Sequence, residues 1–491
     1  MNTLPYFVLI PLAGAFLVVF LNVLTRNKVR VISEILANVI TLALFIMTIF
    51  MFNKSGMYVI GKWVPPLGIN LVLDGLSALM LSIVNLIAFT ATLFSINYMR
   101  RYTANNYYYA LFLLMLAGMN GVLLSGDFFN LFVFIEIASI ASYALVGFGT
   151  EADELEASFK YMVMGGIAST FILLAIALLY SQFGVLNMAY ISEAIANSEF
   201  NILLKFTLFL FIAAFSVKAA IIPFHAWLPD AHPAAPAPIS AMLSGVVIKT
   251  LGLYAMIRVM YNIFGFNGGN MLAYMGLISI MVGGLLALGQ MDMKRLLAYS
   301  SISQIGYIIL GIGLGTKLGI LAALFHLVNH SVFKSLLFMN SGSVYHRLGT
   351  RNLDEMGGLN KVMPITGGTS LIASLSISGM PPFNGFFSKL LIIIACIQSG
   401  HTIFAFWAIA GSIFTLAYYM KMQRYAFFGS LKESYKSIKE SPFFMSVSMI
   451  ILAILCLATS FLLIPQLRDA VLTPAVEVIL NADTYKALVI K

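Results

Sequence analysis

Charged residues are scarce in this chain of 491 residues. Asp, Glu, Lys and Arg together make up 10% of the sequence, hydrophobic residues make up 60%, and the mean hydropathy is +0.95. A soluble domain carries about 25% charged residues, so this chain cannot cover a surface that faces water. Its main solvent must be lipid. The composition therefore predicts an all-α protein that crosses a membrane many times.

Cysteine and the common catalytic motifs are also rare or absent. Cys396 and Cys456 lie far apart in apolar runs, which excludes a disulfide framework and iron–sulfur ligation by CxxC pairs. No P-loop, HExxH or GxSxG is present, and the glycines of residues 311–315 end a predicted helix instead of following a strand. The net charge of +9 comes without a basic cluster, so nucleic acid is not an expected partner. We expect no cofactor and no metal.

Hydropathy in windows of about 19 residues predicts about 14 membrane helices. Proline interrupts the seventh and the twelfth, and residues 56–71 are expected to form a small hairpin outside the membrane. The opening segment lacks a basic start and a cleavage site, so we expect it to stay as the first helix. The expected helix cores are 4–24, 31–51, 72–97, 107–125, 128–148, 160–181, 203–222, 238–261, 271–289, 296–314, 318–340, 364–398, 402–426 and 443–464.

Lysine and arginine are distributed unevenly between the two sets of loops. If the N-terminus is outside, the inner loops hold most of them, including Arg26, Lys28 and Arg30 after the first helix. Cytoplasmic loops carry an excess of Lys and Arg, so this distribution predicts that both termini lie outside. The expected location is the cytoplasmic membrane of a bacterium or an archaeon.

An internal repeat accompanies the two proline-broken helices. The stretch FSVKAAIIPFHAWL (215–228) resembles SLSISGMPPFNGFF (374–387) at an offset of 159 residues, and Pro223 matches Pro382. An odd number of spans separates helix seven from helix twelve, so the two copies are expected to cross the membrane in opposite directions. Paired broken helices in inverted halves indicate an ion or substrate pathway near the membrane midplane.

Four lysines and one glutamate lie within apolar predicted helices: Lys218, Lys249, Lys334, Lys389 and Glu136. A charge near the bilayer centre costs roughly 2.5–3.5 kcal/mol on insertion scales. Each lysine alone is explained as well by snorkelling to an interface, or by a structural ion pair, as by a role in proton transfer. The whole set, placed on helices of both repeat copies, favours a proton relay.

Lysine suits such a relay for a chemical reason. Burial favours the neutral form of its side chain, whereas a nearby carboxylate favours the charged form. A buried lysine can therefore take up or release a proton when its partner moves, and arginine cannot, because it stays protonated. Glu136 is the expected partner of Lys218.

Two histidines precede one of these lysines on the same predicted helix. His326, His330 and Lys334 are spaced i, i+4 and i+8, so they form a stripe that rises about 12 Å. Imidazole titrates near neutral pH and can pass protons on. Haem or metal ligation is the competing interpretation, but no facing set of ligands is apparent in the sequence.

The proline-rich loop PFHAWLPDAHPAAPAPIS (223–240) follows the first helix break. It is either a rigid connector or a site of proton uptake or coupling at one membrane face, through His225, Asp230 and His232. Asp74 and Arg258, at the ends of predicted helices, are expected to cap or anchor those helices instead of moving protons.

Several stretches resemble the antiporter-like subunits of respiratory complex I and their relatives. These stretches are HAWLPDAHPAAPAPISAMLSGVVIKTLGLYAMIR (225–258), MKRLLAYSSISQIGY (293–307), HLVNHSVFKSLLF (326–338) and FFNLFVFIEIASIASYALVGF (128–148). The resemblance implies 14 helices, two inverted five-helix repeats and a hydrated polar axis. It divides the chain into N-terminal helices (1–106), a first repeat (107–262), a second repeat (263–427) and a last helix with a short tail (428–491).

The resemblance also implies roles for particular residues. Glu136 and Lys218 correspond to the family's fifth-helix glutamate and seventh-helix lysine. Lys249 corresponds to the eighth-helix lysine, His330 and Lys334 to the eleventh-helix group, and Lys389 to the twelfth-helix residue. One subunit type of complex I carries glutamate at that last position, so Lys389 disfavours this type.

What remains resembles the antiporter-like subunits of membrane-bound hydrogenases, the D-type subunits of Mrp antiporters or the proximal subunit of complex I, and the 225–243 stretch is nearest to the hydrogenase group. The leading hypothesis is a subunit that moves protons, or sodium ions in their place, within a redox-driven complex. It would have no redox centre of its own, and its partners would be other membrane subunits and a peripheral redox arm. The alternatives are a subunit of a Mrp-type Na⁺/H⁺ antiporter complex and a stand-alone solute transporter.

Overall fold

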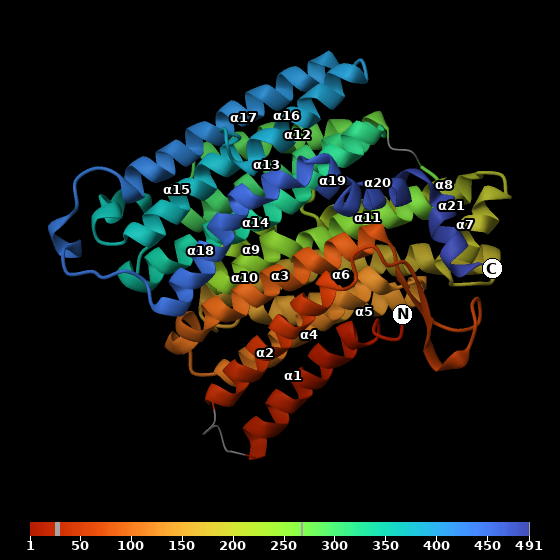
Figure 1. Ribbon diagram of the computed structural model, residues 1–491, viewed down its shortest axis with the longest axis horizontal. Coiled ribbons are helices and arrows are strands. Elements are labelled where there is room, and N and C mark those ends of the chain that lie inside the picture. The colour runs from red at the N-terminus through yellow and green to blue at the C-terminus, as the bar shows by residue number, and fades with distance from the viewer. Residues whose placement is uncertain (25–29, 267–268, 491) are drawn as a thin grey trace.

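The computed structural model describes residues 1–24, 30–266 and 269–490. Arg26 and Lys28 of the first inner loop lie outside the described residues. Within the described part of the chain, 12 helices are long and apolar enough to cross a membrane, which confirms an all-α polytopic membrane protein. The helices run side by side, and the two chain ends lie toward the same end of the bundle (Figure 1).

The N-terminal part contains helices and a hairpin. Its elements are α1 (Tyr6–Leu24), α2 (Arg30–Ile49), β1 (Gly56–Val59), β2 (Asn70–Leu73) and α3 (Gly75–Tyr98). The strands pair antiparallel, with Gly56 opposite Leu73, so the hairpin expected between the second and third helices is present.

The middle of the chain contains the first broken helix and a long helix with π-helical turns. The helices are α4 (Asn105–Leu124), α5 (Phe128–Val146), α6 (Ala152–Phe183), α7 (Met188–Ala196), α8 (Ile202–Lys218), α9 (Leu228–Ala234), α10 (Ala237–Met242) and α11 (Ala255–Ile257). The π-helical turns are Leu243–Val247, Lys249–Tyr254 and Arg258–Ile263, and with α10 and α11 they make one span.

The C-terminal half also contains long helices and one broken helix. Its helices are α12 (Asn270–Leu288), α13 (Met293–Gly313), α14 (Lys317–Leu348), α15 (Pro364–Ser378), α16 (Asn384–Gln398), α17 (Thr402–Met422), α18 (Phe443–Ala458), α19 (Pro465–Val471), α20 (Thr473–Leu480) and α21 (Ala482–Val489). A π-helical turn, Gln423–Phe427, extends α17.

The two breaks fall where the prolines predict them. The first separates α8 from α9, and the second separates α15 from α16. These pieces are short, with 17 residues in α8 and 15 residues each in α15 and α16, so none of them counts among the 12 long helices. The count of 14 helices and the inverted repeats therefore stay predictions.

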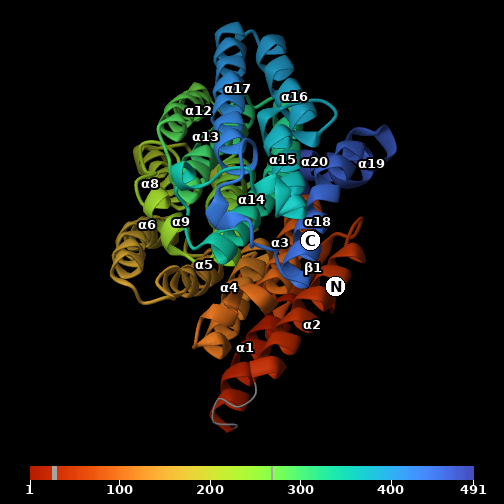
Figure 2. The ribbon, with the colours of Figure 1, turned by 90° about the vertical axis from the view of Figure 1, so that its left-hand side faces the viewer.

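Helix α14 occupies the middle of the bundle. Figure 2 shows α1 and α2 at one edge and α16 and α17 at the opposite edge, with α3 and α14 between them. Every α14 residue from Ala322 to Val344 is buried. Polar side chains on this helix are therefore withdrawn from lipid, which is the placement expected of ionisable groups that line an internal path.

Candidate functional site

The four lysines predicted from the sequence are all buried. Lys218 ends α8, Lys249 lies in the second π-helical turn, Lys334 lies midway along α14, and Lys389 follows the second break on α16. The exposed fractions are 4% for Lys218, 0% for Lys249 and Lys334, and 3% for Lys389. None of them snorkels to a surface, so that interpretation is wrong for each lysine in this fold.

Lys218 faces Glu136 across the space between α8 and α5. Its Nζ lies 3.9 Å from Oε1 of Glu136 and donates hydrogen bonds to the hydroxyls of Ser139 (2.9 Å) and Ser169 (3.2 Å). The Ser169 hydroxyl in turn donates to Glu136. The ion pair is therefore long and is bridged by a hydroxyl, so a small displacement of either helix can open or close it.

The helix break explains why a lysine is stable at this position. The last carbonyls of a helix have no partner within the helix, and its C-terminus carries a partial negative charge that favours a cation. Lys218 is the last residue of α8, and Ala220 just beyond it takes a left-handed conformation (φ 54°). Trp227 donates from Nε1 to the carbonyl oxygen of Val217 (3.0 Å), which fixes the return of the chain.

Lys249 depends on an irregular helix that the sequence did not predict. Its Nζ donates to the backbone carbonyl oxygens of Ser244 (2.6 Å) and Gly245 (2.7 Å). A π-helical turn shifts the backbone hydrogen-bond pattern, and such turns are frequent at functional sites. No carboxylate in the described residues pairs with this lysine, and its two hydrogen-bond acceptors there are backbone carbonyl oxygens.

His326, His330 and Lys334 form a buried stripe on α14. The two imidazole rings are nearly parallel (13°), with centroids 6.3 Å apart. Lys334 donates to the hydroxyl of Tyr419 on α17 (3.2 Å), and neither ring nitrogen of His330 has a hydrogen-bond partner among the described residues. The stripe therefore presents buried polar atoms along one face of α14.

Lys389 lies at the far end of this stripe. Its Nζ has no hydrogen-bond partner within the described chain and lies 4.7 Å from the ring centroid of Tyr307. The neighbouring Ser388 hydroxyl and Nδ1 of His326 are 2.9 Å apart. The structure therefore brings Lys389 next to the histidines, although α16 and α14 are distant in sequence.

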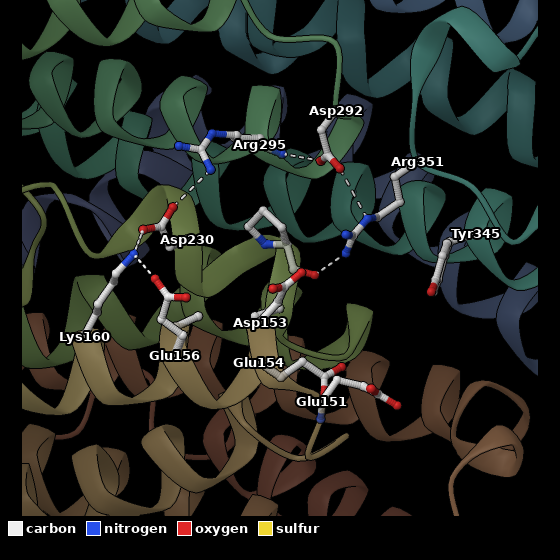
Figure 3. A pocket seen from close by; sticks show the side chains of 13 residues that line it. Glu151, Asp153, Glu154, Glu156, Lys160, Asp230, Asp292, Arg295, Tyr345 and Arg351 are labelled. Atoms are coloured by element: carbon white, nitrogen blue, oxygen red, sulfur yellow. Dashed lines mark hydrogen bonds and ion pairs between the residues drawn. The ribbon is translucent and has the colours of Figure 1, made fainter.

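The loop residues His225, Asp230 and His232 separate into different environments. Asp230 binds Lys160 and Arg295, each at 3.0 Å, in a cleft of about 670 Å³ (Figure 3). His232 is fully buried and stacks on Phe338, with ring centroids 4.4 Å apart. His225 is half-buried and is not among the residues that line the cleft.

The same cleft explains the acidic run at residues 151–156. The carboxylates of Glu151, Asp153, Glu154 and Glu156 line its wall on α6, and Asp292 and Arg351 close the other side (Figure 3). Glu151 and Glu154 also cap the start of α6. The run is therefore both a helix start and the edge of a charged opening.

Asp74 and Arg258 anchor the fold, as the sequence predicts. They form an ion pair of 2.7 Å between almost fully buried side chains. Oδ1 of Asp74 also accepts from the backbone N–H of Ser77 (2.9 Å) at the start of α3. Burial alone would raise the pKa of the Asp74 carboxyl, but the Arg258 charge and these hydrogen bonds hold that pKa below its usual value.

No three His, Cys, Asp or Glu side chains in the described ranges converge as metal ligands would.

Sequence reasoning missed the hydroxyl groups that contact the lysines and histidines, namely Ser139, Ser169, Tyr143, Ser388 and Tyr419. Serine and tyrosine are common in membrane helices, so only their position beside these groups distinguishes them.

Known proteins match nearly the whole chain. The family model described as NADH:quinone oxidoreductase/Mrp antiporter, TM, matches residues 125–415. NADH-quinone oxidoreductase subunit N of Desulforudis audaxviator is 34% identical over 77% of this chain and 76% of the relative. The D-type subunit of the Na(+)/H(+) antiporter of Alkalihalophilus pseudofirmus is 33% identical over 87% of each chain. A chain of the membrane-bound sulfane sulfur reductase, an archaeal respiratory membrane complex, has a TM-score of 0.90 at 32% identity, and the match covers 100% of both chains.

Proposed function

The chain belongs to the family of membrane subunits shared by NADH:quinone oxidoreductases and Mrp antiporters, and we propose that it moves protons along its row of buried lysines and histidines. Sodium ions in place of protons are compatible with the same row. The observation that carries the proposal is the bridged pair of Lys218 and Glu136, 3.9 Å apart. The row also includes Lys249, Lys334, His330, His326 and Lys389.

The pair works as a switch because its two members differ in exposure. The Lys218 side chain is 2% exposed, whereas that of Glu136 is 29% exposed. A neighbouring subunit that contacts Glu136 can shift this carboxylate toward or away from the lysine. Approach stabilises the charged lysine, and withdrawal favours transfer of its proton onward.

Protons would reach the row from the charged cleft. Asp230 lies in the cleft wall, and His232, two residues further on, lies behind it against Phe338. Phe338 is one helical turn from Lys334, whose Nζ lies 5.7 Å from the Phe338 ring centroid. His225 lies earlier in the same loop and is proposed as a coupling residue between the loop and the break.

A substitution series tests the switch. Lys218→Ala and Glu136→Ala are expected to abolish ion movement by the reconstituted complex while the subunits still assemble. Lys218→Arg should also be inactive, because arginine keeps its proton. Lys205→Ala is the matched control, since Lys205 is an exposed lysine on the same helix. Wild-type ion movement in assembled Lys218→Ala would refute the assigned pair.

The assembly around the subunit is proposed to be redox-driven, with other membrane subunits and a peripheral redox arm. The 32% identity to a chain of an archaeal respiratory membrane complex, against 26% to a chain of an Mrp complex of Dietzia, supports this proposal. The alternative is a Mrp-type antiporter complex, which the similarity to a D-type antiporter subunit favours. Copurification of the native complex decides between them, because iron–sulfur or hydrogenase chains belong only to the first.

The proposed orientation has both termini outside the cytoplasmic membrane of a bacterium or an archaeon. The proposed repeats, 107–262 and 263–427, then cross the membrane in opposite directions. An affinity tag after Lys491 should be accessible to an impermeant protease in intact cells and protected in inside-out vesicles. A tag that is protected in intact cells and accessible in inside-out vesicles would place both termini inside and reverse the proposed orientation.

A further inference from the structure

One face of α15 carries hydroxyl groups in register. Thr366, Ser370 and Ser374 are spaced i, i+4 and i+8, and all three are completely buried. At the repeat offset of 159 residues, Ser370 and Ser374 correspond to Phe211 and Phe215 of α8, whose rings stack with centroids 5.8 Å apart. The first broken helix is therefore closed by aromatic rings at the level where the second presents hydroxyl groups.

Helix α17 connects this hydroxyl face to the lysine row. Gln423 donates from Nε2 to the hydroxyls of Ser370 and Ser374, each at 2.9 Å. Gln423 lies four residues beyond Tyr419, so the two side chains share one face of the helix. The Tyr419 hydroxyl accepts from Lys334 at 3.2 Å. Polar groups thus continue from α15 to the central lysine.

Unpartnered polar atoms lie along the same path. Among the described residues, Oε1 of Gln423, Nδ2 of Asn340 and Oγ of Ser341 have no hydrogen-bond partner, and these residues are at most 1% exposed. Asn340 also accepts from the Thr369 hydroxyl at 2.9 Å, which joins α14 to α15. Buried polar groups are almost always hydrogen-bonded, and a buried water typically satisfies those that protein atoms do not.

The path ends at a carboxylate near the surface. Oε1 of Glu440 accepts from the Thr366 hydroxyl at 2.7 Å, and Oε2 accepts from the backbone N–H of Ile365 at 2.7 Å. These bonds cap the N-terminus of α15, and capping by itself accounts for the position of Glu440. A cap does not require the buried hydroxyls and amides that continue behind it along α15.

We propose that these groups form a hydrated branch that gives Lys334 its own access to the predicted inner surface. The α15 branch consists of Glu440, Thr366, Thr369, Ser370, Ser374, Asn340, Ser341, Gln423 and Tyr419. Each hydroxyl or water along it accepts one proton and donates another, so no group changes its net charge. The branch is separate from the Asp230 cleft, and it rests on the proposed function because it supplies the same lysine.

Two substitutions interrupt the branch with little change in volume. Gln423→Leu removes the amide, and Ser370→Ala removes one hydroxyl oxygen. In the complete complex reconstituted in liposomes, Gln423→Leu should slow proton uptake at least about tenfold, equivalent to about 1.4 kcal/mol of barrier, and Ser370→Ala should slow it by a smaller factor. Thr207→Val is the matched control, because the Thr207 hydroxyl donates to the carbonyl of Leu203 within its own helix and lies outside the branch.

A polar replacement separates transport from packing. Gln423→Glu retains an oxygen that water can bind, so it should restore uptake where Gln423→Leu does not. If Gln423→Leu and Ser370→Ala both move protons at the wild-type rate while Lys218→Ala is inactive, the branch is wrong and the proposed function stands. If Lys218→Ala itself moves protons at the wild-type rate, the proposed function is refuted. The branch would then supply a lysine that has no role in transport.

Discussion

Neutralising Asp74 removes the negative member of the most buried ion pair that the structure describes. Asp74 connects the start of α3 to Arg258, and Arg258 also contacts Tyr485 of α21, its Cζ lying 4.7 Å from the ring centroid. The pair therefore joins the N-terminal helices, the long span with π-helical turns and the C-terminal segment. Asp74→Asn keeps the shape and the capping ability of the side chain, because Asn and Asp are equally good N-caps.

The size of the effect follows from what remains buried. Arg258 is 3% exposed, and after the substitution the described partners of its guanidinium are neutral, namely Asn262 (2.9 Å) and the Tyr254 hydroxyl (3.1 Å). Breaking a buried pair by removing one charge costs about 3–5 kcal/mol. We therefore expect Asp74→Asn to lower the free energy of unfolding by about 3 kcal/mol or more.

Asp127→Asn is the matched control. Asp127 is also a buried N-cap, accepting from the backbone N–H groups of Phe129 (2.9 Å) and Asn130 (3.0 Å), but it has no cation partner in the described residues. Thermal unfolding of the purified subunit in detergent measures both variants. The double variant Asp74→Asn with Arg258→Gln should be more stable than the sum of the single effects predicts. Equal losses in Asp74→Asn and Asp127→Asn would refute the reasoning.

The pH dependence has a definite sign. The pKa of folded Asp74 lies below its usual value, so the unfolded chain binds the proton more readily. The stabilisation is therefore complete above the unfolded pKa of about 3.9 and is lost as pH falls through the lower folded pKa. The stability difference between wild type and Asp74→Asn should be constant near neutral pH and should shrink only in strong acid.

Two further predictions concern packing and the cleft. Gly276→Ala should destabilise the protein by about 1–3 kcal/mol, because a Cβ there would lie 2.6 Å from the backbone nitrogen of Leu310 where α12 meets α13. Gly368→Ala is its control, since nothing lies within 4 Å of that Cβ in the described part of the chain, and thermal unfolding should show no loss. Asp230→Asn should slow ion uptake by less than about tenfold, because partly exposed pairs are worth about 1 kcal/mol or less. An abolished rate in that variant would show that Asp230 carries the ion itself.

Sequence patterns were most informative where the membrane imposes a strict rule. Apolar runs of helical length predicted the long helices, because backbone groups in lipid must be satisfied within a helix. Prolines 223 and 382 predicted the two breaks, since proline lacks the N–H group that continues a helix. The spacing of His326, His330 and Lys334 predicted a single face of α14, because helical periodicity alone decides it.

Tertiary structure decided which side chains meet. Nothing in the sequence places Ser169 between Lys218 and Glu136, or Tyr419 beside Lys334, because these contacts join helices that are far apart along the chain. The π-helical turn that presents two carbonyls to Lys249 was also not predicted, since it depends on packing and not on local propensity.

The placement of four lysines within membrane helices was thus determined by the sequence, and a charge there is costly at the membrane centre. Their order and their partners were decided only by the fold, because a hydrogen bond requires two groups within about 3 Å, a condition that only the packed helices create. The oxygen atoms of α15 illustrate the difference. In the sequence, Ser370 and Ser374 are ordinary small residues of a membrane helix. In the fold, their hydroxyls accept hydrogen bonds from Gln423, which lies on the same helix face as Tyr419, the partner of Lys334.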